Sequence, residues 1–143
     1  MLRRYSFWLT TALVVQILTA LIHSLSFFRK PAPSNETEEQ LFNLLNTYER
    51  DLGAGFHPTS ADLFIALSAC FTLVYLLGGL INWYLLRKKA DPSILKGITG
   101  IQILIFGAGF ILMYVYTFLP PIVLTGLVFA FLLPAYFLNK GES

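Results

Sequence analysis

The sequence predicts an all-α, polytopic membrane protein: four transmembrane helices in an antiparallel bundle, with a short amphipathic helix outside the cytoplasm. Of its 143 residues 56% are hydrophobic and only 13% are charged, against about 25% charged in soluble domains. Residues 97–139 hold no charged side chain at all. A helix of that length would extend over roughly twice the ~30 Å hydrocarbon core. This stretch must therefore cross the membrane, turn and cross back.

Four apolar segments are long enough to span, at about residues 5–28, 62–86, 95–119 and 121–138. Each is close to the ~20 residues that a spanning helix needs. The adjacent Pro120 and Pro121 predict the turn between the last two segments, and Pro134 predicts a tilt or distortion near the end of the fourth. Four spans leave almost no chain for a soluble domain, so residues 1–143 are predicted to form a single transmembrane domain.

The charges predict how the chain is oriented. With four crossings, seven of the ten basic residues fall on one side of the membrane: Arg3, Arg4, Arg87, Lys88, Lys89, Lys96 and Lys140. The other side receives six of the eight acidic residues: Glu36, Glu38, Glu39, Glu49, Asp51 and Asp62. By the positive-inside rule both termini are cytoplasmic and the acidic loop, residues 29–61, is outside. We expect a multi-pass protein of the bacterial cytoplasmic (inner) membrane.

The first segment has one alternative interpretation. Arg3 and Arg4 followed by an apolar run can form a cleaved signal peptide, which would leave three spans. The run is longer than a typical signal-peptide core, and no convincing small-x-small cleavage site precedes Arg29, so we expect the segment to be retained. Cys70 is the only cysteine, which excludes an internal disulfide and a dithiol mechanism.

The outer loop has the pattern of an amphipathic helix. Asn35 and Glu38 have capping-box spacing. An apolar stripe with helical spacing follows at Leu41, Leu44, Leu45 and Tyr48. We predict a helix at about residues 36–50, broken by glycines at 53 and 55. It is either a connector that shields the ends of the spans or a lid over a site open to the outer leaflet. Thr59 and Asp62 repeat the capping-box spacing before the second span.

Polar and small side chains share one face of the first span: Ala12, Gln16, Thr19, Ala20 and His23. Such a stripe is typical of close helix packing in membranes. It can also line a partly polar pocket toward the outer leaflet, with side chains from other segments. The candidate ligand-pocket residues are His23, Gln16, Thr19, His57, Tyr114 and Thr125.

Several kinds of chemistry lack the residues they need. His23 and His57, with one cysteine, are too few to predict a metal or haem site. No carboxylate lies within a span, which argues against proton-coupled transport. No phosphate-binding glycine loop, nucleophile elbow or zinc-protease motif is present. We therefore predict no catalytic residues, no cofactor, no metal and no nucleic-acid partner.

The layout resembles a group of small, uncharacterised bacterial four-helix integral membrane proteins. The features that carry the resemblance are the first span with His23, the acidic outer helix and the segment 59–64 that leads into the second span. The resemblance covers most of the chain. It implies a location in the membrane and does not imply an activity.

Two functional hypotheses follow. The first is a non-enzymatic structural or accessory protein, whose partners are the lipid bilayer and either another membrane protein or a second copy of the chain. The second is a binding protein or enzyme for a lipophilic small molecule such as a quinone, a lipid or a sterol-like compound. In that case the ligand would enter from the outer leaflet, and His23 would act as acid, base or hydrogen-bond donor.

Overall fold

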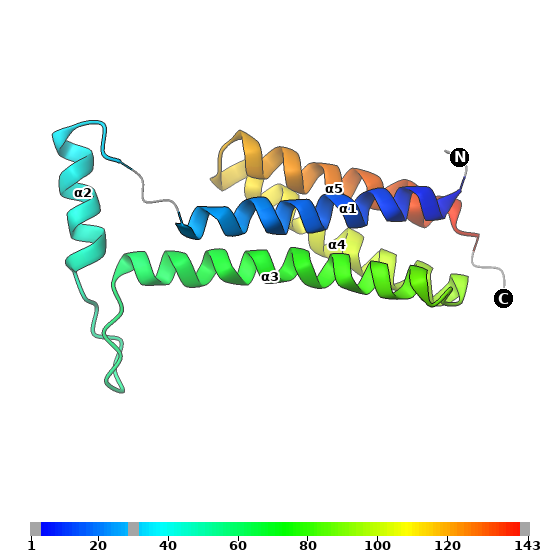
Figure 1. The fold of residues 1–143 in the computed structure, drawn as a ribbon, viewed down its shortest axis with the longest axis horizontal. Coiled ribbons are helices and arrows are strands. Elements are labelled where there is room, and N and C mark those ends of the chain that lie inside the picture. The colour runs from blue at the N-terminus through cyan, green and yellow to red at the C-terminus, as the bar shows by residue number, and fades with distance from the viewer. Residues whose placement is uncertain (1–3, 29–31, 141–143) are drawn as a thin grey trace. The chain divides into compact units, whose positions relative to one another are not determined.

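The computed structural model describes residues 4–28 and 32–140, and this part of the chain is all-helical, without strands. Its elements are α1 (Tyr5–Ser24), the 3-10 helix η1 (Leu25–Phe28), α2 (Glu36–Thr47), α3 (Ser60–Arg87), α4 (Pro92–Tyr116) and α5 (Leu119–Leu138) (Figure 1). Four helical segments, α1 with η1, α3, α4 and α5, are long and apolar enough to cross a membrane. The all-helical class and the four long apolar helices are thus confirmed.

The start of α4 is fixed by its capping residues. Asp91 is the N-cap, and its Oδ1 accepts a hydrogen bond from the Ser93 backbone N–H at 2.7 Å. Pro92 follows at the first helical position, where its missing N–H costs no helix hydrogen bond. The helix therefore begins at Pro92, before the predicted start at residue 95.

The turn between α4 and α5 lies just before the two prolines. Thr117 closes α4, since its backbone N–H and its Oγ1 both donate to the Met113 carbonyl, at 3.0 and 2.7 Å. Phe118 is the N-cap of α5, and Pro120 and Pro121 lie in the first turn of that helix. Prolines suit the first turn of α5, because the backbone N–H groups there have no acceptor within the helix. Further along, α5 continues through Pro134 to Leu138.

The cap of α2 contains one of the two hydrogen bonds of the predicted capping box, and the second bond goes to a different residue. Asn35 Oδ1 accepts from the Glu38 backbone N–H at 2.9 Å, as in a capping box. The Glu38 carboxylate then accepts from the Ser34 backbone N–H at 2.6 Å, one residue before the cap. This bond from the Ser34 amide holds the pKa of Glu38 below its ordinary value.

The helix α2 ends at Thr47, where the sequence predicted residue 50. Beyond it the chain is extended, and Glu49 pairs with Thr59 in an isolated antiparallel bridge. The chain reverses through Gly53, Ala54 and Gly55, which all have positive φ, at 80°, 53° and 81°. Two of these three positions are glycine, the residue that enters this region without steric cost.

The capping box predicted before the second span is present. Asp62 Oδ2 accepts from the Thr59 backbone N–H at 2.9 Å and from Thr59 Oγ1 at 2.7 Å. The Asp62 N–H donates to Thr59 Oγ1 at 3.2 Å. These bonds start α3 at Ser60.

The chain divides into two compact units. The first unit comprises residues 1–20 and 74–143, and the second comprises residues 21–73. The buried hydrophobic side chains of the described residues belong to the first unit: Leu9, Ala12, Ala20, Tyr75, Leu95, Phe106, Val128, Leu132 and Ala135. In this unit α4 and α5 lie side by side (Figure 1).

Candidate functional site

The polar stripe of α1 faces the interior of the first unit. Ala12, Gln16, Thr19 and Ala20 are all buried, and Leu9 extends the same face. The small residues leave room for neighbouring helices, as expected of a packing surface in a membrane helix. Gln16, which carries the largest polar group of this face, is 0% exposed.

Gln16 belongs to a ring of three buried amides, which we call the amide ring. Its other members are Asn82 of α3 and Gln102 of α4. Gln16 Nε2 donates to Gln102 Oε1 at 2.9 Å, and Gln102 Nε2 donates to Asn82 Oδ1 at 2.9 Å. Asn82 Nδ2 donates to Gln16 Oε1 at 2.9 Å and to Gln102 Oε1 at 3.0 Å. The ring ties three helices together.

Within the amide ring every carbonyl oxygen accepts and every NH₂ group donates. Both amide hydrogens of Asn82 are used, one toward each of its neighbours. Asn82 is 0% exposed and Gln102 is 6% exposed, so water does not compete for these bonds. A buried polar group without a partner would cost about 1–3 kcal/mol. Amides are neither acids nor bases at neutral pH, so the ring is suited to holding helices in register.

Two glycines of α3 make room for α1. A Cβ atom added at Gly78 would lie 2.6 Å from Gln16 Nε2 and 3.3 Å from Phe106 Cε2. A Cβ atom added at Gly79 would lie 2.6 Å from Ile17 Cδ1. Gly78 and Gly79 therefore permit the close approach that brings Gln16 to its partners.

A second polar contact lies in the same unit. Tyr75 of α3 is 2% exposed, and its hydroxyl is 2.6 Å from Thr125 Oγ1 of α5. Thr125 Oγ1 donates its single hydrogen to the Pro121 carbonyl at 2.7 Å, so Tyr75 is the donor in the first bond. The Tyr75 ring also packs edge-on against Phe106, with 5.2 Å between the ring centroids.

Thr19 is the exception to this full pairing. Its Oγ1 is buried and has no hydrogen-bond partner among the described residues.

The remaining candidate residues lie in different surroundings. Tyr114, in the first unit, is 70% exposed. His23 and His57 belong to the second unit, where His57 is exposed in the loop before α3. The partly buried His23 ring stands edge-on to Phe71, with 5.9 Å between ring centroids, and it also lies near Phe27. Whether His23, Gln16, Thr19, His57, Tyr114 and Thr125 bind a common ligand stays a prediction.

The sequence predicts Gln16 as a site residue but does not identify Asn82 and Gln102 as its partners. The four predicted spans hold three amide side chains, Gln16, Asn82 and Gln102. Because a buried amide needs a partner, that short list could have suggested the ring. Tyr75 gave no comparable signal, since a tyrosine within a span can equally well face lipid.

Among the described residues, no three His, Cys, Asp or Glu side chains lie close enough together to hold a metal ion. Comparison with family models, with curated proteins and with solved structures gives no significant match for this chain.

Proposed function

We propose that the protein is a non-enzymatic, multi-pass protein of the bacterial cytoplasmic membrane, with a structural or accessory role or one in self-association. In this proposal the four long helices cross the bilayer as an antiparallel bundle of one transmembrane domain. The basic residues at the chain ends and between α3 and α4 support cytoplasmic termini, and the acidic loop would then be outside.

The observation that carries the proposal is the amide ring. Its polar groups hydrogen-bond to one another, and the three side chains are 0% to 6% exposed. Few polar atoms are therefore left at the amide ring to bind or transform a ligand. Polar side chains that bond across helices fix helix register and orientation. Such an interior favours a rigid scaffold over a catalytic chamber.

The outer surface of the first unit is suited to lipid or to another apolar partner. Large aliphatic side chains of α4 are widely exposed, including Leu104 at 75% and Ile111 at 63%. An apolar surface of this extent on a long helix needs either acyl chains or a protein partner.

Labelling of single cysteines tests the membrane placement. In a Cys70→Ser background, Ser34→Cys reports on the acidic loop and Ser93→Cys on the start of α4; both serines are exposed and both changes are small. A membrane-impermeant maleimide should label Ser34→Cys on intact cells, and Ser93→Cys only after permeabilisation. Equal labelling of both variants on intact cells would contradict the proposed topology.

Crosslinking in native membranes tests the proposed role. A structural or self-associating protein should give a defined adduct, with a second copy of the chain or with one other membrane protein. Recovery of the monomer alone, at several crosslinker lengths, would overturn this part of the proposal.

The second candidate function is binding of a lipophilic molecule, and the surroundings of His23 favour it. The partly buried ring of His23 lies among aromatic side chains, with Phe27 and Phe71 beside it, and such surroundings suit an apolar ligand. Native mass spectrometry of protein from mild detergent should then show a bound quinone-like, lipid-like or sterol-like molecule that His23→Ala releases. An unliganded protein, unchanged by the substitution, would count against this candidate.

A further inference from the structure

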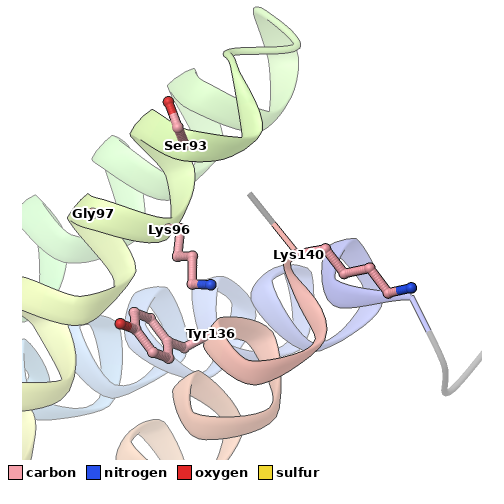
Figure 2. A pocket seen from close by; sticks show the side chains of 5 residues that line it. All are labelled: Ser93, Lys96, Gly97, Tyr136 and Lys140. Atoms are coloured by element: carbon pink, nitrogen blue, oxygen red, sulfur yellow. The ribbon is translucent and has the colours of Figure 1, made fainter. Parts of the chain in front are cut away.

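An open pocket of about 310 Å³ lies between the beginning of α4 and the end of α5 (Figure 2). It is lined by Ser93, Lys96, Gly97, Tyr136 and Lys140. These residues all belong to the first unit, so one compact part of the chain forms the whole pocket. Lys96 and Lys140 are also two of the basic residues whose distribution predicts the orientation of the chain.

Contacts between the two helix ends hold the walls of this pocket. Asn139 Nδ2 donates to the Pro92 carbonyl at 2.8 Å, which fastens the end of α5 to the first turn of α4. The Tyr136 ring packs on Gly100, where an added Cβ would lie 3.2 Å from Tyr136 Cε2. A Cβ atom added at Gly97 would meet nothing within 4 Å, so this glycine leaves the pocket open.

The pocket carries positive charge. Lys96 Nζ lies over the Tyr136 ring, 5.3 Å from its centroid, and Figure 2 shows the Lys96 side chain extending from α4 to the side on which Tyr136 lies. Lys140 extends away from the pocket on its flexible stem, which lets its amine swing toward a bound anion. The neighbouring acid is Asp91, whose carboxylate accepts from the Ser93 side chain and backbone; these bonds lower the pKa of Asp91. Among the described residues at these helix ends, two lysines and one neighbouring carboxylate give the site a net positive charge.

An apolar strip continues from the pocket along α4. Gly97, Ile101 and Leu104 follow one another at helical spacing, so they share a face of the helix. Ile101 is 55% exposed and Leu104 is 75% exposed. A cationic pocket that leads onto an exposed apolar strip fits a molecule with an anionic head and an apolar tail, whereas a free phosphate ion would leave the strip unused.

We propose that this pocket binds the phosphate of an anionic phospholipid, with Lys96 and Lys140 as charge partners and an acyl chain along Ile101 and Leu104. The inference rests on the proposed membrane topology, which places this end of the helices at the cytoplasmic leaflet. Basic pockets between helices on that side are suited to anionic head groups.

Competitive lipid binding tests the site. The protein is placed in mixed micelles with equal amounts of phosphatidylglycerol and phosphatidylcholine, and native mass spectrometry counts the lipid that stays bound. We expect a preference for phosphatidylglycerol that falls about fivefold for each lysine replaced in Lys96→Ala and Lys140→Ala. Asp91→Asn keeps a capping side chain but removes the opposing charge, so it should raise the preference.

The matched control is the double variant Arg87→Ala/Lys88→Ala, which removes two charges from the same end outside the pocket. It should keep the preference that Lys96→Ala/Lys140→Ala loses. Equal loss in both variants would show attraction by general surface charge, and an unchanged Lys96→Ala/Lys140→Ala variant would show binding elsewhere. Either result would overturn the site.

Two further experiments complete the test. One distinguishes a bound lipid from a bound free phosphate ion, and the other distinguishes failure of this inference from failure of the proposed function. Displacement of the bound lipid by millimolar inorganic phosphate would indicate a free-anion site and would overturn the lipid assignment. If cysteine labelling confirms the topology but no lipid preference is found, this inference fails alone. If labelling contradicts the topology, the proposed function fails first.

Discussion

Each of the two compact units has its own pattern of side-chain hydrogen bonds, and only the first contains pairs of side chains far apart in the sequence among the described residues. In the first unit, side chains that pair are 20 to 86 residues apart in the sequence, as in Gln16 with Gln102 and Asn82 with Gln102. In the second unit, side-chain bonds join residues two to four positions apart, as in Glu38 with Ser34 and Asp62 with Thr59. The described hydrophobic core also lies in the first unit.

The difference indicates which part resists perturbation. Long-range pairs between buried amides require several helices to be in place at once, so their loss should affect a cooperative unit. Caps and turns form from neighbouring residues and depend little on distant parts of the chain. The second unit is therefore expected to change locally, while the first responds as a whole.

The largest effect should come from breaking the amide ring at one member. Asn82→Leu leaves Gln16 Oε1 and the Gln102 NH₂ group short of partners, at a cost of about 2–6 kcal/mol for the two groups. The combination Gln16→Met/Asn82→Leu/Gln102→Met removes all the polar groups together and should cost less than the single change. Unfolding of the purified protein in detergent measures both.

The control for this comparison is Gln40→Met, since Gln40 is an exposed amide of α2 in the second unit. Its unfolding free energy should stay within about 0.5 kcal/mol of the parent protein. If Asn82→Leu were equally harmless, the contrast between the units would be wrong.

A smaller effect should come from narrowing the space beside the ring. Gly78→Ala places a methyl group 2.6 Å from Gln16 Nε2, so the amide must move, at about 1–3 kcal/mol. The cost should shrink in a Gln16→Ala background, where that side chain no longer blocks the methyl group. Gly97→Ala, in open space on α4, should be neutral or stabilising by up to about 1 kcal/mol. If Gly78→Ala were as neutral or stabilising as Gly97→Ala, helix propensity alone would decide both positions and the predicted clash with Gln16 would be wrong.

The smallest effect should be a pH response confined to the second unit. The pKa of Glu38 is lowered because its carboxylate accepts from the Ser34 N–H. Its contribution is therefore present above the ordinary carboxyl pKa and is lost as the pH falls through the lowered value. Hydrogen exchange at the start of α2, corrected for intrinsic rates, should accelerate in acid. The amide ring has no ionisable group, so exchange near Gln102 should lack this step.

Glu38→Gln provides the control, since it keeps an oxygen that can accept from Ser34 but cannot ionise. The acid step at Ser34 should disappear in this variant. A step that persists would assign the response to another carboxylate of the loop.

The local elements were predictable from the sequence because their causes are local. Asn35 with Glu38 and Thr59 with Asp62 have capping spacing, and both pairs are hydrogen-bonded. The end of α2 was not predictable in this way, because Glu49 leaves the helical pattern to pair with Thr59. The sequence predicted that Pro120 and Pro121 form the turn between the last two spans. The structure shows instead that they lie in the first turn of α5, just after that connection.

By itself the sequence determined the helical class, the four long apolar segments and the caps, since hydropathy and spacing act over a few turns of chain. The tertiary structure decided that Gln16 meets Asn82 and Gln102, and that Gly78 leaves room for the meeting. It also decided that Lys96, Tyr136 and Lys140 share a pocket. Those contacts depend on how helices far apart in the sequence pack, and apolar periodicity shows which residues face inward without showing which residue each one meets.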